Sequence, residues 1–300
     1  MAERTAGRHA GAGTGYSVLT PEQAALLPTD EDVVSYREHG YYLSGLILTE
    51  EEIVAAREGS ERFYVGDVTD PGVEALERYR PMGEYGEGLR KHDYSSFFRP
   101  ELATLARHAL IGAVAARLTG SPSIRLWHDQ LLYKPPVRQA SVGWHTDRQY
   151  WLSCTSDEML TAWIPFHDCP PEMGAITFID GSHRWPDNSR GLDFFSHDLE
   201  RLEQGFDSGG RPVVKSPMSF RKGQVSFHNC RVIHGSGPNS TDQPRRSIAV
   251  HLQDEANRYR EFRREDGHLA RHGNDALCRK VNGMPDYTDP AVFPLLFRTD

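Results

Sequence analysis

The chain has 300 residues, of which 38% are hydrophobic, with a formal net charge of −8 and an isoelectric point near 6.0. This length and apolar content suffice for one sizeable hydrophobic core, and the acidic balance argues against non-specific binding to nucleic acid. The four cysteines form no Cys-x-x-Cys pair, which argues against a structural zinc site. They are too sparse for a disulfide scaffold, which fits a reducing compartment.

The first 28 residues are rich in Gly and Ala and are expected to form a disordered tail. They lack the apolar core of a secretory signal, and no segment has the apolar length of a membrane span. We therefore expect a cytoplasmic protein with no membrane partner. Since no linker separates two cores, residues 29–300 are predicted to form a single domain.

Residues 29–122 are predicted to form a helical N-terminal part. A short helix is expected over residues 30–40, and Thr49 with Glu52 three residues later is typical of the capping box that begins another helix. Apolar residues recur at helical spacing over 100–118, between an initial proline and a following glycine. This last segment is the clearest predicted helix of the chain.

Residues 123–253 show short alternating strands separated by turns, without regular alternation of strands and helices. The pattern predicts a mainly β fold with flanking helices, a double-stranded β-helix (a jelly-roll or cupin-like barrel). Its long insertion, residues 185–222, is where a substrate-covering loop would lie. For the irregular residues 65–95, both a surface loop and a lid agree with the composition. Residues 254–300 form a charged extension, in which 258–264 is expected to be a solvated helix.

His145, Asp147 and His234 are the strongest candidates for a functional site. On an extended strand the side chains at 145 and 147 point to the same side, so both can bind one ion. His234 ends a strand-like segment, residues 224–234, beside a turn at 235–240. A His-x-Asp pair alone is expected about once by chance in such a chain. Two histidines and one carboxylate, however, form the facial triad of non-haem iron(II) oxygenases, which leaves metal positions open for a co-substrate and dioxygen.

Three more residues are candidates near this triad. A planar cation such as Arg245 is what the distal carboxylate of a dicarboxylate like 2-oxoglutarate needs. His228 would share a face with His234 on a straight strand and competes with it as a ligand, but we interpret His228 as structural. His183 is left outside the metal site, because two histidines and one carboxylate already complete it.

Together these segments resemble the phytanoyl-CoA dioxygenase family of iron(II)- and 2-oxoglutarate-dependent oxygenases. The resemblance runs from about residue 32 to about residue 253 and follows landmarks in the expected order. One such match would be weak, whereas the ordered set is specific. The landmarks are the segments 35–42, 128–136, 144–151, 160–166, 174–183 and 234–239, followed by Arg245.

The resemblance implies a role for each matching residue and implies iron(II), 2-oxoglutarate and dioxygen as cofactors and co-substrates. The implied iron ligands are His145, Asp147 and His234. Arg245 matches the arginine that binds the distal carboxylate of 2-oxoglutarate, with the Ser236 hydroxyl beside it. Since halogenating relatives carry a small residue at the position of Asp147, hydroxylation or a related oxidation is expected here. The remaining implied contacts to the co-substrate are Gln130, Trp163 and Lys91.

An enzyme of this kind converts 2-oxoglutarate to succinate and carbon dioxide while oxidising an unactivated C–H bond. We expect a small-molecule substrate, such as an intermediate of secondary metabolism, and a monomer or homodimer. The wall of the substrate site is predicted to include Tyr150, Trp151, Tyr133 and His92, although each of these residues fits a barrel core equally well.

Two other classes of protein agree with parts of the pattern. A non-oxidative cupin-like metalloenzyme, a hydrolase or an isomerase, would use the same triad with zinc or manganese but would not need Arg245. A binding or regulatory protein would keep the fold and lose catalysis, against which the intact triad argues. Within the oxygenases, hydroxylation, desaturation, ring closure and epoxidation use the same metal ligands, so the sequence does not separate these reactions or name the substrate.

Overall fold

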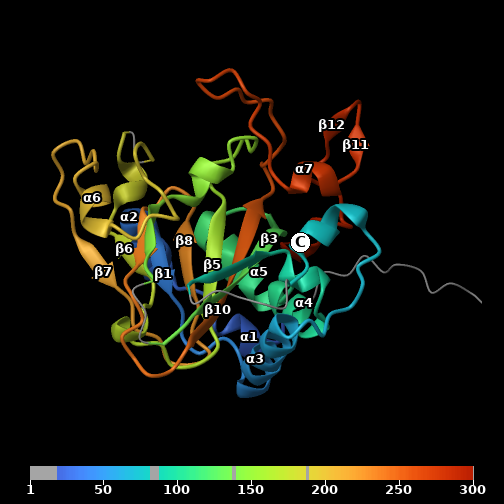
Figure 1. The fold of residues 1–300 in the computed structure, drawn as a ribbon, viewed down its shortest axis with the longest axis horizontal. Coiled ribbons are helices and arrows are strands. Elements are labelled where there is room, and N and C mark those ends of the chain that lie inside the picture. Colours follow the sequence, from blue (N-terminus) through green and yellow to red (C-terminus); the bar gives the residue numbers. More distant parts are fainter. Residues whose placement is uncertain (1–18, 82–87, 137–139, 187–188, 300) are drawn as a thin grey trace, which may run out of the picture.

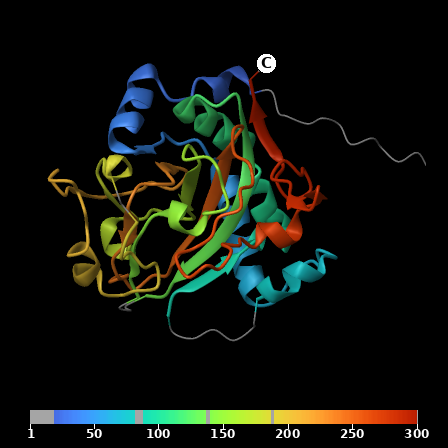
Figure 2. The same cartoon turned by 90° about the horizontal axis from the view of Figure 1, so that it is seen from above.

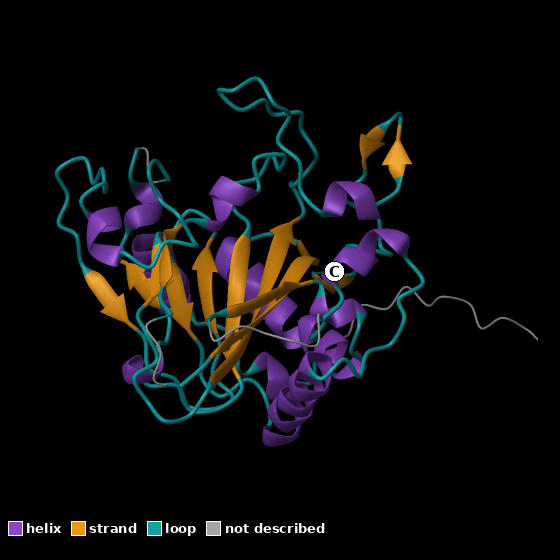
Figure 3. Ribbon diagram, in the orientation of Figure 1, coloured by secondary structure: helices purple, strands orange, loops and turns teal. Residues whose placement is uncertain are grey.

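The computed structural model describes residues 19–81, 88–136, 140–186 and 189–299. Its centre is a pair of antiparallel sheets, one of seven strands and one of four (Figures 1 and 3). Helices cover the outer side of the larger sheet, as the view from above also shows (Figure 2). The expected mainly β fold with flanking helices is confirmed.

The strands come from more of the chain than the predicted barrel of residues 123–253. The larger sheet has the order β1-β8-β5-β10-β3-β13, with β2 also paired to β3, and the smaller sheet has the order β4-β9-β6-β7. A separate hairpin pairs β11 with β12. The larger sheet contains β1 (Tyr41–Leu43), β2 (Arg90–Asp93), β3 (Ser123–Lys134), β5 (Leu160–Pro165), β8 (Ser226–Asn229), β10 (Arg245–Asp254) and β13 (Leu295–Arg298). The others are β4 (Val142–His145), β6 (Thr177–Ile179), β7 (Lys215–Pro217), β9 (His234–Ser236), β11 (Lys280–Val281) and β12 (Met284–Pro285).

Several helix boundaries follow from local capping. Thr29 and Thr49 cap α2 and α3 through capping boxes with Asp32 and Glu52, and Gly40 ends α2 with a left-handed φ of 85°. The α-helices are α1 (Pro21–Ala24), α2 (Asp30–His39), α3 (Glu50–Tyr64), α4 (Pro100–Ala106), α5 (Ala109–Thr119), α6 (Leu199–Glu203) and α7 (Asn274–Leu277). Short 3-10 helices are η1 (Glu74–Tyr79), η2 (Ser95–Phe97), η3 (Asp147–Tyr150), η4 (Pro171–Met173) and η5 (Ser182–Arg184).

The predicted single helix over residues 100–118 is two helices, α4 and α5. Arg107 leaves the helical region at φ −105° and ψ 17°, and His108 is extended at φ −66° and ψ 124°. At this break the His108 ring lies 2.9 Å from the Glu52 carboxylate of α3. The tertiary contact accompanies a break that apolar spacing alone does not reveal.

Two other predictions about the ends of the chain differ from the structure. Residues 1–18 of the predicted tail lie outside the described residues, whereas residues 21–24 form α1 and Leu27 packs against the main core. Residues 258–264 form no helix, because Tyr259 and Arg263 make isolated β-bridges to Cys154 and Leu269. In the described part of the chain, no helix combines the length and apolarity needed to cross a membrane.

The larger sheet separates two environments. Leu131 of β3 packs in the main core between the sheet and the helices, whereas Leu132 packs in a second core between the two sheets. Because side chains alternate along a strand, Gln130, Leu132 and Lys134 share the inner side. The functional candidates depend on this alternation.

Candidate active site

The two histidines of the predicted triad come from the two paired strands β4 and β9 of the smaller sheet, and Asp147 follows directly after β4. His145 ends β4 and pairs in register with His234 at the start of β9. Asp147 does not lie on the strand as expected, because β4 ends at His145 and Asp147 begins η3. Thr146 is still extended, at φ −113° and ψ 144°, so the side chains at 145 and 147 remain on one side. One ligand atom from each triad residue lies within 4.8 Å of the others.

Backbone hydrogen bonds orient both histidines toward the carboxylate. Nδ1–H of His145 donates to the Gly143 carbonyl at 2.8 Å, and Nδ1–H of His234 donates to the Val232 carbonyl at 3.0 Å. The two Nε2 atoms then face Oδ1 of Asp147, at 3.9 and 3.8 Å. Burial lowers the pKa of both rings, and that of His234 falls well below its usual range, so the imidazoles are neutral as metal ligands must be.

The second oxygen of Asp147 is held from the larger sheet. The Thr161 hydroxyl donates to Oδ2 of Asp147 at 2.5 Å and lies 2.7 Å from Nδ1 of His251. Nε2 of His228 lies 3.3 Å from the same carboxylate oxygen. His228 therefore supports the carboxylate from behind, in agreement with a structural role. Oδ1 is left to face the two triad histidines.

A cavity of about 440 Å³, counted with the space open to solvent, adjoins the triad between the sheets. Arg245 lines it, with only 2% of its surface exposed. Its Nη1 donates to the Gly174 carbonyl at 2.9 Å, while Nε and Nη2 have no partner among the described residues. Burial lowers the pKa of this guanidinium to about 10, which leaves it charged at neutral pH.

Other predicted co-substrate residues surround this guanidinium. The Trp163 ring lies 5.4 Å from Cζ of Arg245, and Trp163, Gln130 and Ser236 line the same cavity. Lys134, which the sequence reasoning missed, is fully buried and donates to the Ser236 hydroxyl at 2.7 Å. Its position opposite Arg245 in the β3–β10 register places both basic side chains on one side of the sheet, and burial lowers the pKa of Lys134 well below its usual range. Strand alternation from Gln130 was the signal that could have identified Lys134.

A second and larger cavity, of about 870 Å³ counted with the space open to solvent, also adjoins the triad. It shares His145, Asp147, Gln130, Phe194 and His251 with the first cavity. Of the residues predicted to contact substrate, Tyr150 and Trp151 line it. Lys91 also lines this larger cavity and not the one that contains Arg245, and its Nζ is 2.9 Å from both carboxylate oxygens of Asp93.

His92 and Tyr133 do not face either of these cavities. His92 packs edge-on against Phe63 and Tyr64 at 5.2 and 5.6 Å, and Tyr133 packs against Tyr64 at 5.7 Å. In the β2–β3 register, His92 is opposite Leu131 and Tyr133 is opposite Arg90. Both side chains therefore lie on the face of the larger sheet that carries the helices. The prediction that they form part of the substrate wall therefore does not agree with their placement.

The insertion of residues 185–222 reaches the triad through Phe194. The Phe194 ring lies edge-on to His145 at 4.8 Å and lines both cavities. Its carbonyl accepts from Gly143 N–H at 3.0 Å, which binds the insertion to the strand that carries His145. A Cβ at Gly143 would lie 2.0 Å from the Asp193 carbonyl oxygen, so only glycine fits this approach.

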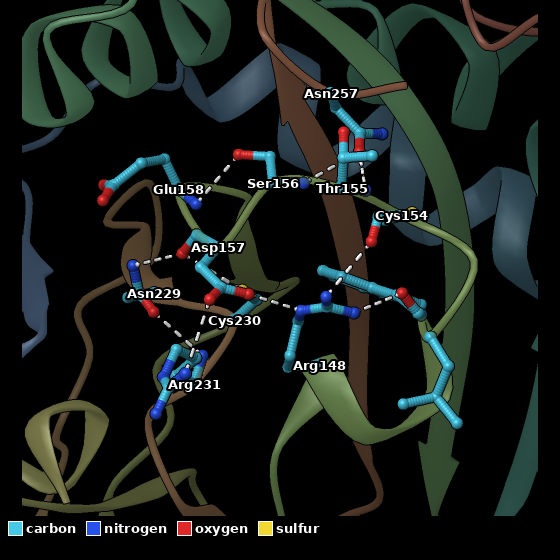
Figure 4. A network of polar contacts seen from close by, with 12 residues as sticks. Arg148, Cys154, Thr155, Ser156, Asp157, Glu158, Asn229, Cys230, Arg231 and Asn257 are labelled. Carbon is cyan, nitrogen blue, oxygen red and sulfur yellow. Dashed lines mark hydrogen bonds and ion pairs between the residues drawn. The ribbon is translucent and has the colours of Figure 1, made fainter. Parts of the chain in front are cut away.

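Polar contacts behind the triad connect its two ligand-bearing segments (Figure 4). Arg148, directly after Asp147, donates through Nε to the Asp157 carboxylate at 2.6 Å and through Nη2 to the Cys154 carbonyl at 3.1 Å. Arg231, three residues before His234, lies 3.4 Å from the same Asp157 carboxylate. Asp157 therefore ties the segment after the first ligand pair to the segment before the second histidine.

The arrangement fits iron(II) and 2-oxoglutarate on structural grounds. Two neutral imidazoles and one carboxylate present a three-ligand set on one face, and a buried guanidinium with free donors lies on the adjoining cavity. A buried cation without an anionic partner is costly in an empty site. A dicarboxylate dianion would bind the metal at the triad with one end and pair with the Arg245 guanidinium at the other.

Comparison with known sequences leads to the same chemistry. The sequence profile described as phytanoyl-CoA dioxygenase matches residues 36–247. The chain is 25% identical over 222 residues to a probable alpha-ketoglutarate-dependent hypophosphite dioxygenase of Stutzerimonas stutzeri, covering 72% of this chain and 75% of that protein. It is 24% identical over 235 residues to an ectoine dioxygenase of Bordetella bronchiseptica, covering 73% of each.

Solved structures agree over nearly the whole chain. The non-haem alpha-ketoglutarate-dependent carbocyclase SnoK from nogalamycin biosynthesis is 29% identical with a TM-score of 0.64, covering 90% of this chain and 97% of that one. The epimerase SnoN from the same biosynthesis is 25% identical with a TM-score of 0.65, covering 92% and 99%. The chain belongs to the phytanoyl-CoA dioxygenase family and is a non-haem iron dioxygenase that depends on 2-oxoglutarate.

Proposed function

We propose that this enzyme hydroxylates an unactivated C–H bond of a small molecule held in the larger cavity. His145, Asp147 and His234 would bind iron(II), and the smaller cavity would hold 2-oxoglutarate. When bound, iron with 2-oxoglutarate and dioxygen supplies the oxidising power for this reaction, with succinate and carbon dioxide as co-products.

The observation that carries this proposal is the unpaired, buried guanidinium of Arg245. Its free Nε–H and Nη2–H form the side of the guanidinium that can donate to both oxygens of one carboxylate. The Gly174 carbonyl fixes the third nitrogen, and no carboxylate of the residues that the structure describes pairs with Arg245. A non-oxidative enzyme that used only the triad would have no need for this arrangement.

The remaining residues of the smaller cavity would orient the co-substrate. Lys134 holds the Ser236 hydroxyl and the Gly237 carbonyl, the latter at 2.5 Å, so the hydroxyl has a fixed direction. Gly174 adopts a left-handed φ of 72°, and a Cβ there would lie 3.0 Å from Nζ of Lys134. Phe194 and Trp151 would exclude water from the reacting C–H bond, because both are buried at the junction with the larger cavity.

The likeness to two enzymes of nogalamycin biosynthesis supports a substrate from secondary metabolism. It also supports a second candidate reaction, ring closure or inversion at carbon without insertion of oxygen, because SnoK is a carbocyclase and SnoN an epimerase. Mass spectrometry of the product separates these reactions. Hydroxylation adds one oxygen atom, ring closure removes two hydrogens, and inversion leaves the mass unchanged.

Anaerobic titration of the iron(II)-loaded protein with 2-oxoglutarate tests the co-substrate role. We expect a weak visible charge-transfer band in the wild type, and its absence in Asp147→Ala. In Arg245→Ala the band should require roughly thirtyfold or more 2-oxoglutarate, since loss of a buried charged contact costs about 2–5 kcal/mol.

Arg246→Ala is the matched control, because its guanidinium faces the helices and lies 3.5 Å from the Glu61 carboxylate. This variant should titrate like the wild type. An unchanged affinity in Arg245→Ala would remove Arg245 from the site. No band in the wild type, with iron demonstrably bound, would favour a non-oxidative metalloenzyme.

A further inference from the structure

The larger cavity has a wall that lies outside the sequence range shared with the family. The family profile ends at residue 247, whereas the residues that line this cavity together with His145 and Asp147 include Arg264, Arg271, His272 and Gly273. These residues belong to a segment, residues 258–273, that continues from β10. The segment rises as a loop above the larger sheet (Figure 1). This wall therefore lies beyond the part of the chain that the family profile matches.

The segment is anchored at both ends. Near its start, the Arg260 N–H donates to the Ser153 carbonyl at 2.8 Å. Just after it, the side-chain amide of Asn274 donates to the Trp127 carbonyl at 2.9 Å, and Asn274 is fully buried. Within the loop, the Ala270 N–H donates to the Phe262 carbonyl at 2.8 Å. These bonds give the wall a defined position over the cavity.

Close packing fixes the segment at Gly273. A Cβ there would lie 2.4 Å from the Tyr94 hydroxyl oxygen and 2.6 Å from that of Tyr79. Both tyrosines also line the larger cavity. The segment therefore lies directly against the N-terminal half of the chain, with residues from both parts forming one enclosure.

The charges of this enclosure are unbalanced. Lys91 and Asp93 neutralise each other, since Nζ is 2.9 Å from both carboxylate oxygens. Asp147 belongs to the triad. Arg264 and Arg271 remain, and neither forms an ion pair within the described part of the chain. The mouth of the larger cavity thus presents two guanidinium groups that are available to an anion.

Deeper in the cavity, buried histidines offer unused hydrogen-bonding atoms. Neither ring nitrogen of His128 has a partner among the described residues, although His128 is only 5% exposed. The Thr161 hydroxyl donates to Asp147, so its oxygen accepts from Nδ1–H of His251. Nε2 of His251 is then a bare acceptor, and it also lacks a protein partner. A substrate hydroxyl would satisfy such an acceptor.

The rest of the lining is flat and aromatic. Tyr79, Tyr150, Trp151 and Phe195 join Phe194 around a volume of about 870 Å³. Aromatic walls of this kind pack well against flat, rigid rings.

We propose that residues 258–273 determine substrate specificity, with Arg264 and Arg271 binding an acidic group of a hydroxylated ring compound. The acid lies at the mouth, the ring lies between the aromatic side chains, and the hydroxyl lies near His251. This inference rests on the proposed function, because it assigns the larger cavity to the substrate.

Binding of a matched pair of probes tests the inference. The probes are 6-hydroxy-2-naphthoate and the corresponding neutral amide, titrated by calorimetry into anaerobic protein saturated with iron(II) and 2-oxoglutarate. We expect the wild type to bind the acid about tenfold more tightly than the amide, the combined effect of two partly solvated ion pairs. The double variant R264A/R271A should bind both probes equally.

Arg263→Ala is the matched control, since this neighbouring exposed arginine bonds its own loop at the Gly267 carbonyl and does not line the cavity. It should keep the preference for the acid. Equal binding of the two probes by the wild type, no binding of either, or an unchanged preference in R264A/R271A would overturn the inference. The charge-transfer band with 2-oxoglutarate, recorded on the same samples, reports separately on the proposed function.

Discussion

Thr161→Val tests how the protein fixes the metal-binding carboxylate. The Thr161 hydroxyl is 2.5 Å from Oδ2 of Asp147, and both side chains are buried. Valine keeps the size and shape of threonine but cannot donate. We expect Asp147 to rotate more freely, so that Oδ1 no longer faces the two histidines at a fixed angle.

Two independent estimates of the loss of iron(II) affinity agree for this substitution. A hydrogen bond to a charged group contributes about 1.5–3 kcal/mol, which corresponds to roughly 10- to 150-fold in affinity. Loss of a partner that orients a metal ligand typically weakens metal affinity by about 10- to 100-fold. We therefore expect the iron(II) dissociation constant of Thr161→Val to rise by about 10- to 100-fold. The fold should persist, because the change is confined to one hydroxyl in the sheet.

Anaerobic competition with a coloured iron(II) chelator measures this constant, and circular dichroism checks the fold. Thr161→Ser keeps the hydroxyl and should bind iron almost like the wild type. Ser226→Ala is a control, because this buried hydroxyl lies on the neighbouring strand and has no partner among the described residues. Wild-type affinity in Thr161→Val would refute the reasoning. Equal weakening in Thr161→Ser would assign the effect to packing of the methyl group.

Two stability changes test the supports around the site. Arg148→Ala should lower the free energy of unfolding by about 1–2 kcal/mol in urea, because it removes the donor to the Cys154 carbonyl and leaves the half-exposed Asp157 carboxylate with only the longer contact to Arg231; a loss below about 0.5 kcal/mol would show that the network of Figure 4 is dispensable. Gly143→Ala should cost about 1–3 kcal/mol and speed proteolysis within residues 185–222, since its Cβ would clash with the insertion. Gly45→Ala, with no atom within 4 Å of its added Cβ, should leave both properties unchanged.

The sequence was most informative where a residue type is demanded by chemistry. His145, Asp147 and His234 were found from their spacing and types, and the structure brings one ligand atom of each within 4.8 Å of the others. Arg245 was found as a planar cation, and it is buried beside them. Their roles in binding iron and 2-oxoglutarate remain predictions for the experiments above.

The sequence was least informative where a contact depends on long-range pairing. Thr161 and His251 bracket Asp147, yet both look like ordinary strand residues, and only the β5–β10 register brings them together. The break between α4 and α5 is likewise accompanied by a contact with Glu52, which is far away along the chain. The wall of residues 258–273 has no periodic pattern, because its position depends on single anchors such as Asn274.

Side-chain alternation explains both the successes and the errors at the cavity. Lys91 and His92 are neighbours in sequence, but Lys91 is opposite Leu132 and His92 is opposite Leu131. Leu132 faces the space between the sheets and Leu131 faces the helices. Choosing His92 and Tyr133 for the substrate wall placed two residues on the wrong face, since a shift by one position reverses every side chain of a strand. Because alternate residues of a strand share a face, Lys134 lies on the same side as Gln130, which is also the side of Arg245. Once one residue of a strand is known to face the site, its alternate neighbours are therefore better candidates than its adjacent ones.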